Sequence, residues 1–136
     1  MTHYLTLVDF AFKAIKNKTK TIEMRLNDEK RKNIKRFDEI EFTHIDTKEK
    51  IYVWVKHIHH YPNFEELYKH FDKVSLGYNK DEVANPSDMQ QFYSKENIEK
   101  YGVLGIEIEL LEKGKSEVER INKTIEIIEE VTNTKI

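Results

Sequence analysis

Short runs of alternating residues are the feature that most constrains the fold of this 136-residue chain. Apolar residues occupy every second position at residues 21–26, and the same period returns at residues 39–43. A period of two is typical of strands that bury one face. A third run, IYVWVKHI at residues 51–58, is rich in the β-branched and aromatic residues that strands favour. We therefore predict three consecutive antiparallel strands.

Further strands and short helices are predicted around these three strands. We expect strands at residues 4–8 and 102–110, and helices at residues 10–17, at 63–71 and from Ser94 onward. Asp9 and Asn63 are suited to cap the first two helices through their side-chain oxygens. Closing so few strands into a barrel would remove the exposed edges of an open sheet. We predict an α+β fold, mainly β with α decoration, built as a small barrel of about five to six strands with short peripheral helices.

The end of the chain has a helical period. Ser116 and Glu119 form a capping-box pattern, S-x-x-E, and the apolar stripe beyond it consists of Val118, Ile121, Ile125 and Ile128. We predict a domain at residues 1–112, followed by a C-terminal helical extension at residues 113–136. That helix would pack on the domain or on a partner, and a dimer formed through it is one alternative.

Charge is distributed unevenly, although the formal net charge is only -2. Residues 13–36 hold ten basic side chains against three acidic ones, whereas residues 107–136 hold eight Glu against five Lys and Arg. Such asymmetry favours a nucleic-acid or phosphate partner on one face. The chain has no Cys, which excludes disulfides and thiolate catalysis. The absence of Cys fits a reducing cytoplasm, and no apolar run approaches the roughly 18 residues that span a bilayer. We therefore expect a cytoplasmic protein without a membrane partner.

The first candidate site lies in the first of the three strands and in the charged connection after it. It consists of Lys20, Glu23, Arg25, Asp28, Lys30 and Arg31. Arg binds anions through two parallel hydrogen bonds, Lys acts as a point charge, and Glu serves as an acceptor or base. The alternative is a network of surface ion pairs, which contributes little to stability and is common in a chain with 35% charged residues.

A second candidate is a group of histidines and acids. It consists of His57, His59, His60, Glu65, Glu66 and His70. His57 and His59 are two residues apart and so share a strand face, which would allow a metal site. No recognised zinc spacing accompanies them, and solvated or partly buried histidines at a strand end are the simpler interpretation. We expect neither a metal nor a cofactor.

A third candidate is base stacking on Tyr52 and Trp54, which alternate with Val53 and Val55. Aromatic residues in a strand more often belong to the core.

Residues 18–25 resemble the signature G-x-K-x-x-E-x-R of the ASCH domain family, a branch of the PUA-like barrels. The resemblance continues through IKNKTKTIEMRLNDEKRKNIKRFDEIEF, YPNFEELY and YSKENIEKYGVLGIEIEL, and so covers roughly residues 5–110. It implies a PUA-like barrel and a cleft, lined by Lys20, Glu23 and Arg25, that accepts RNA or a nucleotide-like ligand.

Two positions depart from the family pattern. Lys18 stands where the signature has Gly, and Phe37 stands where the usual sequence reads Gly-Asp. Because Gly typically supplies a positive φ in a tight turn, Lys18 implies either backbone strain or a turn made one residue earlier by Asn17.

The resemblance implies two functions. The first is RNA binding through the cleft, which the basic residues 13–36 independently support. The second is hydrolysis, because small bacterial members of the family are amidohydrolases that act on N4-acylated cytidines. Their catalytic Lys corresponds to Lys20 and their nucleophilic Thr to Glu23, so catalysis here would use Lys20 and Glu23, with Thr21 or Thr19 as nucleophile.

The hydrolases also use a glutamate later in the chain, for which Glu65 and Glu66 are the nearest candidates. A third alternative is a structural domain that assembles through the C-terminal helix.

Overall fold

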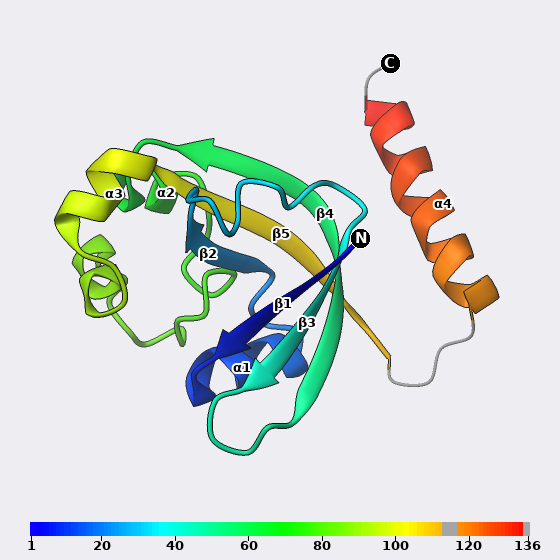
Figure 1. The fold of residues 1–136 in the computed structure, drawn as a ribbon, viewed down its shortest axis with the longest axis horizontal. Helices are drawn as coiled ribbons and strands as arrows, with labels where there is room; N and C mark the ends of the chain where they lie inside the picture. The colour runs from blue at the N-terminus through cyan, green and yellow to red at the C-terminus, as the bar shows by residue number, and fades with distance from the viewer. Residues whose placement is uncertain (113–116, 135–136) are drawn as a thin grey trace.

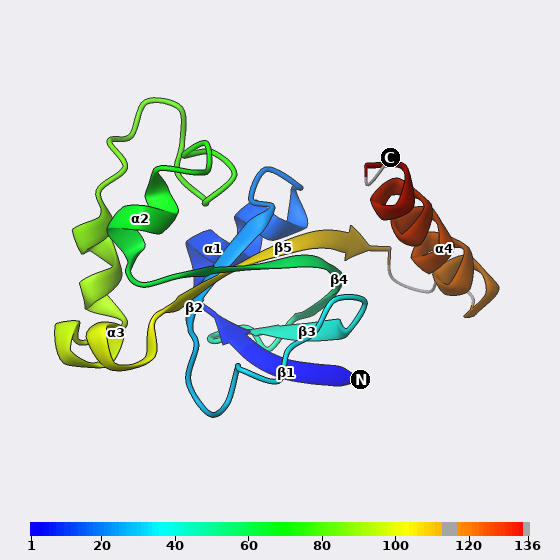
Figure 2. The ribbon, with the colours of Figure 1, turned by 90° about the horizontal axis from the view of Figure 1, so that it is seen from above.

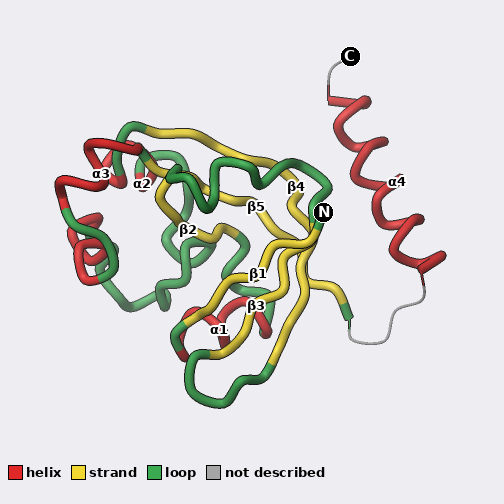
Figure 3. Tube along the Cα trace, viewed as in Figure 1, coloured by secondary structure: helices red, strands yellow, loops and turns green. Residues whose placement is uncertain are grey.

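The structure is a computed structural model that describes residues 1–112 and 117–134, with side chains described to residue 112 and from 124 to 132. In chain order its elements are β1 (Thr2–Leu7), α1 (Asp9–Lys16), β2 (Ile22–Leu26), β3 (Glu39–His44), β4 (Lys50–Tyr61), α2 (Phe64–Tyr68), the 3-10 helix η1 (Pro86–Gln91), α3 (Lys95–Tyr101), β5 (Val103–Leu111) and α4 (Glu117–Thr134). The predicted capping box of Ser116 and Glu119 and the side chains of Val118 and Ile121 lie outside the described residues. Loops make the long connections, from β2 to β3 and from α2 to η1 (Figure 3).

The five strands form one sheet in the order β1-β3-β4-β5-β2, bent into a half-barrel (Figures 1 and 2). β1 and β3 are parallel, and the other neighbours are antiparallel. The α+β fold is as predicted. The prediction of three consecutive antiparallel strands is correct for β3 and β4 and wrong for β2, which pairs with β5. Alternation reports which face a strand buries and carries no information about its neighbours.

Two apolar clusters lie on either side of β2. One consists mainly of α1 and the inner face of the sheet, with Phe12, Ile15, Phe42, Val53 and Ile106 among its members. The other packs Ile22, Met24 and Leu26 of β2 against α2, η1 and α3. All five residues of β2 are therefore buried, including Glu23 and Arg25, and the expected half-buried strand is corrected to a fully buried one.

The helix caps agree in part with the sequence. Asn63 Oδ1 accepts a hydrogen bond from the Glu66 backbone N–H at 2.9 Å, as a cap should. Asp9 does not cap α1; Val8 is the capping residue, without a side-chain bond. The Asp9 carboxylate instead lies 2.8 Å from Nε2 of His44 and 3.0 Å from Nζ of Lys13. These tertiary and i,i+4 partners draw the carboxylate away from the helix end.

Lys18 and Phe37, the two departures from the family pattern, both have positive φ, at 71° and 75°. Asn17 has a φ of −88°, so the turn is not moved one residue earlier. The Asn17 side chain supports the turn, because its Oδ1 accepts from the backbone N–H of Thr19 at 3.1 Å. The backbone of both residues thus has a left-handed conformation, which Gly would adopt without strain.

α4 lies on the opposite side of the sheet from α2 and α3 (Figure 1). Ile127 is buried, and Glu130, three residues later, lies 3.9 Å from Lys56 of β4. Ile125 and Ile128 of the predicted stripe are 46% and 45% exposed, so the described part of that stripe is not the packed face. The spacing of the apolar residues allows more than one face of α4 to pack on the domain. The contact with β4 lies on the face that carries Ile127. Among the described residues, no helix is both long enough and apolar enough to cross a membrane.

Candidate functional site

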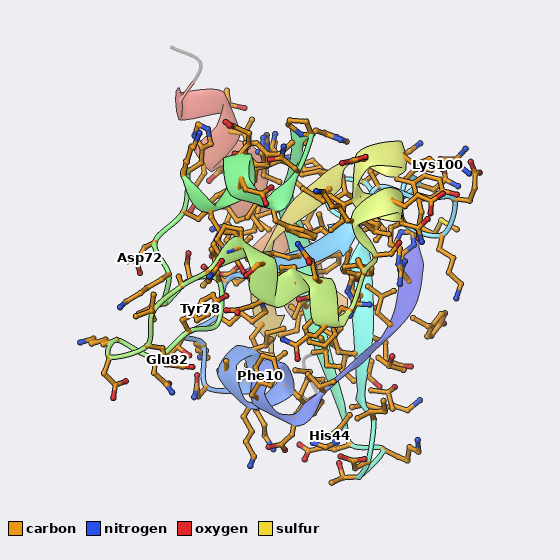
Figure 4. The ribbon with its side chains drawn as sticks, turned by 90° about the vertical axis from the view of Figure 1, so that its left-hand side faces the viewer. Phe10, His44, Asp72, Tyr78, Glu82 and Lys100 are labelled. Carbon is orange, nitrogen blue, oxygen red and sulfur yellow. The ribbon has the colours of Figure 1, made fainter. Side chains whose placement is uncertain are left out.

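A cavity of about 860 Å³ opens between the N-terminal half of the chain and the connection from α2 to α3. Its walls come from the end of β1 and from α1, from residues 19–25, and from residues 68–93. Figure 4 faces this side of the molecule, with Phe10 on α1 below and with Tyr78 and Glu82 on the opposing connection. Segments that are far apart in the sequence therefore enclose one site.

The cavity lies where the half-barrel is open. β1 and β2 are the two edges of the sheet and are not paired with each other. The guanidinium of Arg25 spans this opening, because its Nη2 donates to the carbonyl of Thr6 on β1 at 2.7 Å. One side chain therefore connects the two edge strands, and that side chain lines the cavity.

Lys20, Glu23 and Arg25, predicted together from the sequence, lie together in the wall of this cavity. Arg25 donates from Nε to Oε2 of Glu23 at 2.9 Å, and its Nη2 lies 2.8 Å from the same oxygen. The other carboxylate oxygen, Oε1, lies 3.5 Å from Nζ of Lys20 and accepts from the Met24 backbone N–H at 3.2 Å. The three side chains form a buried network, unlike a surface ion-pair network.

Lys20 connects β2 to the loop that covers it. Its Nζ donates to the carbonyls of Ile22 and Leu76, each at 2.7 Å. Gly77 passes directly over the lysine with a φ of +111°, and a Cβ on Gly77 would lie 3.1 Å from Cδ of Lys20. The three N–H donors of the ammonium therefore face two carbonyls and a carboxylate. Lys20 is placed as a structural connection between two walls of the cavity.

The electrostatics of the network favour the ionised forms of Glu23 and Arg25. Burial would raise the pKa of Glu23, but Arg25 and Lys20 outweigh burial and lower that pKa. Burial would lower the pKa of Arg25, but Glu23 outweighs burial and raises it. Burial does lower the pKa of Lys20, with Glu23 opposing the shift. One anion between two cations gives this network a formal net charge of +1, whereas the whole cavity lining has three cations against four carboxylates.

Asp28, Lys30 and Arg31, the other predicted site residues, do not line this cavity in the described structure. Arg31 and Asp28 form an ion pair at 2.6 Å, and Lys30 is exposed. Thr21 is exposed just before β2 and also lies outside the cavity lining, whereas Thr19 is part of it. The predicted residues thus separate into a buried group that lines the cavity, a partly buried ion pair outside the lining, and the exposed Lys30.

Sequence reasoning missed the aromatic residues of the cavity. Phe10 and Phe92 are 57% and 42% exposed, and Tyr93 completes the aromatic part of this wall beside Arg25. The sequence did contain a signal for Phe10, because this apolar residue does not share the face of α1 that buries Phe12 and Ile15. An apolar residue on the other face of a helix indicates an exposed ring. Residues 72–93 show no helical or strand periodicity of apolar residues, so the sequence could not assign Phe92 and Tyr93 to the cavity wall.

Acidic and hydroxyl groups line the opposite wall. Tyr78 donates to Oδ2 of Asp88 at 2.7 Å, and its hydroxyl lies 2.9 Å from that of Tyr68. Glu82 lines the same part of the cavity. The site therefore presents cationic, aromatic and acceptor groups to one enclosed volume.

The second and third candidates lie elsewhere. The rings of His57 and His59 share a face as predicted, with centroids 4.5 Å apart, and His59 Nε2 lies 3.2 Å from Glu107. Among the described residues, no group of three His, Asp or Glu side chains could hold a metal ion.

Glu66, His70 and Tyr52 of these candidates have local partners. Glu66 pairs with Lys69 at 2.8 Å, His70 stacks on Tyr61, and Tyr52 donates to Glu41 at 3.2 Å. Glu65, Glu66 and Trp54 are not part of the cavity lining.

Comparisons with known proteins agree with this fold. The crystal structure of hypothetical protein PH0355 is 34% identical, covers 82% of this chain and 100% of its own, and has a TM-score of 0.67. The solution structure of protein PF0455 from Pyrococcus furiosus is 35% identical, with 82% and 99% coverage and a TM-score of 0.61. No curated protein matches. The family model of the ASCH domain matches residues 5–112, and the chain therefore belongs to the ASCH domain family.

Proposed function

We propose that this ASCH domain binds RNA or a nucleotide-like ligand in the cavity between α1 and the connection from α2 to α3. The observation that carries the proposal is the pairing of Arg25 with exposed aromatic side chains in one enclosed volume. Arg25 is held by Glu23 and Thr6, so its guanidinium is already ordered before a ligand arrives. An ordered side chain loses less conformational entropy on binding.

Phe10 and Phe92 are suited to the bases. Proteins recognise single-stranded RNA by stacking splayed bases on aromatic side chains, and each such contact contributes about 1–3 kcal/mol. Both rings are substantially exposed although they belong to a cavity wall, which leaves their faces available to a ligand. The acceptors on the opposite wall, Asp88 and Glu82, suit amino groups of bases and hydroxyl groups of ribose.

The charge of the network supports an anionic ligand. Arg25 and Lys20 exceed Glu23 by one unit, so this wall of the cavity is locally cationic. Lys13 also lines the cavity but pairs with Asp9 at 3.0 Å, and Glu82 and Asp88 line the opposite wall, so the phosphate would lie beside Arg25. Phosphate neutralisation by such groups supplies affinity that is independent of sequence. The mixed charges of the cavity suit a short ligand of one or a few nucleotides.

No specific observation favours the amidohydrolase alternative. A nucleophile would have to replace the missing threonine, and Thr21 is not part of the cavity lining. The hydroxyl of Thr19 lies within hydrogen-bonding distance of the Ala14 carbonyl and of Asn17 Oδ1, without a basic partner among these contacts. The ammonium of Lys20 and the carboxylate of Glu23 are each engaged by several partners. We therefore propose binding alone.

The test uses variants at the mouth of the cavity, which leave the buried network intact. Binding of the four nucleoside monophosphates and of a short mixed-sequence RNA is measured by calorimetry and fluorescence anisotropy. Phe10→Ala and Phe92→Ala should each weaken binding by roughly 5- to 140-fold, from the stacking energies above. Tyr4→Ala is the matched control, since Tyr4 is 71% exposed on β1 and does not line the cavity. Equal affinities of all three variants would contradict the proposal.

A further inference from the structure

We propose that a second cavity, beneath the β2–β3 connection, binds backbone phosphates of an RNA strand whose base occupies the first cavity. The inference rests on the proposed function. The second cavity measures about 290 Å³. Its charged or titratable lining residues are Lys32, Lys35, Arg36, His57 and His60, and the rest of the lining is apolar.

The second cavity is lined by cationic side chains without carboxylates, unlike the first cavity. It brings three permanent cations and two imidazoles together, and no carboxylate is among its lining residues. Lys35 makes no ion pair within the described part of the chain. Lys32 pairs with Glu29 at 2.7 Å, but Glu29 is 80% exposed, and exposed pairs contribute little. These ammonium groups are therefore available to an anion.

Arg36 is held in place from two directions. Its Nε donates to the carbonyl of Lys56 on β4 at 2.9 Å, and its guanidinium lies 5.2 Å from the ring centroid of Phe37. Phe37 has positive φ, and its backbone N–H donates to the carbonyl of Val55 at 2.8 Å. The strained residue thus anchors the arginine over β4, and Arg36 offers a preorganised group to phosphate oxygens.

The strand pairings of the sheet relate the position of the second cavity to that of the first. Arg25, which lines the first cavity, lies opposite Leu104, and Leu104 lies opposite His60. Leu104 and His60 both line the second cavity. Neighbouring strands are about 4.8 Å apart, so the backbones of Arg25 and His60 are separated by roughly 10 Å. Directly opposed residues project to the same face of a sheet, so Arg25 and His60 lie on one row, with the buried Leu104 between them.

The separation suits a short single strand. A stacked strand advances about 3.4 Å per nucleotide, so roughly 10 Å corresponds to about three nucleotides. A mononucleotide whose base lies in the first cavity cannot also reach the second, whereas a hexanucleotide can reach both. Ligand length therefore separates the contributions of the two cavities.

The experiment compares adenosine monophosphate with a labelled hexanucleotide RNA across a salt series. The double variant Lys32→Ala and Lys35→Ala removes two cations from the second cavity. The matched control, Lys16→Ala and Lys50→Ala, removes two exposed lysines that pair with Glu49 and Glu41 and line neither cavity. Circular dichroism and thermal melting establish that both proteins are folded.

The Lys32 and Lys35 variant should lower hexanucleotide affinity by roughly 25-fold in 0.1 M salt and reduce the salt slope by about 1.4, the contribution of two single-strand phosphate contacts. Its affinity for adenosine monophosphate should stay unchanged, and the control should change neither affinity by more than about twofold, because of screening. Equal losses in the two double variants would overturn the inference, as would a matching loss of mononucleotide affinity.

The two proposals fail in different ways. If Phe10→Ala weakens both ligands but the Lys32 and Lys35 variant binds as wild type does, only the second cavity is refuted. If the wild-type protein binds neither ligand, the proposed function fails, and the RNA role of the second cavity fails with it.

Discussion

Replacing Glu23 by Gln tests the buried network directly. The substitution keeps the size of the side chain and removes the only carboxylate placed between Lys20 and Arg25. Wild-type Glu23 accepts from Lys20 and Met24 through one oxygen and from Arg25 through the other. The glutamine amide has one oxygen and one NH₂ group, so a donor must face one of the two cations. We expect Glu23→Gln to destabilise the domain strongly.

The size of the expected loss in the free energy of unfolding follows from the burial of Lys20 and Arg25. The side chains of Lys20 and Arg25 are only 4% and 11% exposed, so water cannot replace the lost carboxylate. Removing one partner of a buried ion pair costs about 3–5 kcal/mol, because the remaining charge is left without compensation. Since domains are stable by only about 5–15 kcal/mol, this loss is a large share of the free energy of unfolding. The melting temperature should fall by roughly 10–20 °C.

Urea denaturation measures the free energy of unfolding, and the slope with denaturant shows whether the unfolded states are comparable. The control is Glu29→Gln, which removes the carboxylate of an exposed pair with Lys32 and should cost less than about 1 kcal/mol. A loss below about 1 kcal/mol for Glu23→Gln, equal to that of the control, would refute the account of the network as a buried, mutually dependent set of charges.

The same pair of proteins gives a prediction for pH. The pKa of Glu23 is lower in the folded state than its unfolded value of about 4.3, because Arg25 and Lys20 outweigh the opposing effect of burial. A lowered carboxyl pKa adds stability above the unfolded pKa and loses it as pH falls through the folded pKa. The stability gap between wild type and Glu23→Gln should be constant above about pH 5 and narrow below about pH 4. A constant gap at every pH would contradict the assignment of an ionised Glu23.

Three further substitutions test particular features of the fold by urea denaturation. Lys18→Gly should stabilise the domain by about 1 kcal/mol, because it removes a side chain from a left-handed conformation with φ 71°. The same change at Lys16, the last residue of α1, should destabilise the domain. A destabilised Lys18→Gly would show that this turn is not strained. Gly77→Ala should destabilise by about 1–3 kcal/mol, since φ is +111° and the new Cβ would meet Lys20, and an unchanged stability would contradict that packing. Ile127→Ala should cost about 2–4 kcal/mol, while Ile125→Ala, at a 46% exposed position, should cost less than about 0.5 kcal/mol. Equal effects of the two isoleucine variants would show that α4 does not pack through Ile127.

Local patterns predicted most of the elements and the identity of the motif residues. The alternation around Met24 and Ile40 correctly located β2 and β3, because each has apolar residues on one face. The cap at Asn63 was predictable because its side chain binds within its own turn. These features depend on residues close together in the sequence.

The features that could not be predicted depend on distant segments. Glu23 and Arg25 are buried where β1, α1 and residues 68–93 meet around β2, whereas alternation alone assigned the polar face to solvent. The second cavity joins the β2–β3 connection to His57 and His60, more than twenty residues later in the sequence. The charge count of residues 13–36 detected the cations but could not divide them between the two cavities.

The contacts of Lys20, Glu23 and Arg25 determine how substitutions at these positions should be interpreted. Lys20 binds the carbonyl of Leu76 in one wall of the first cavity, and Arg25 binds the carbonyl of Thr6 in another. Glu23 contacts both cations, so the three side chains connect β2 to β1 and to the α2–η1 connection, which are far apart in the sequence. Substitutions at these positions should alter the shape of the cavity as well as its charge. Loss of binding in a Lys20 variant would therefore not identify Lys20 as a ligand contact, whereas loss in a Phe10 or Phe92 variant of unchanged stability would identify one.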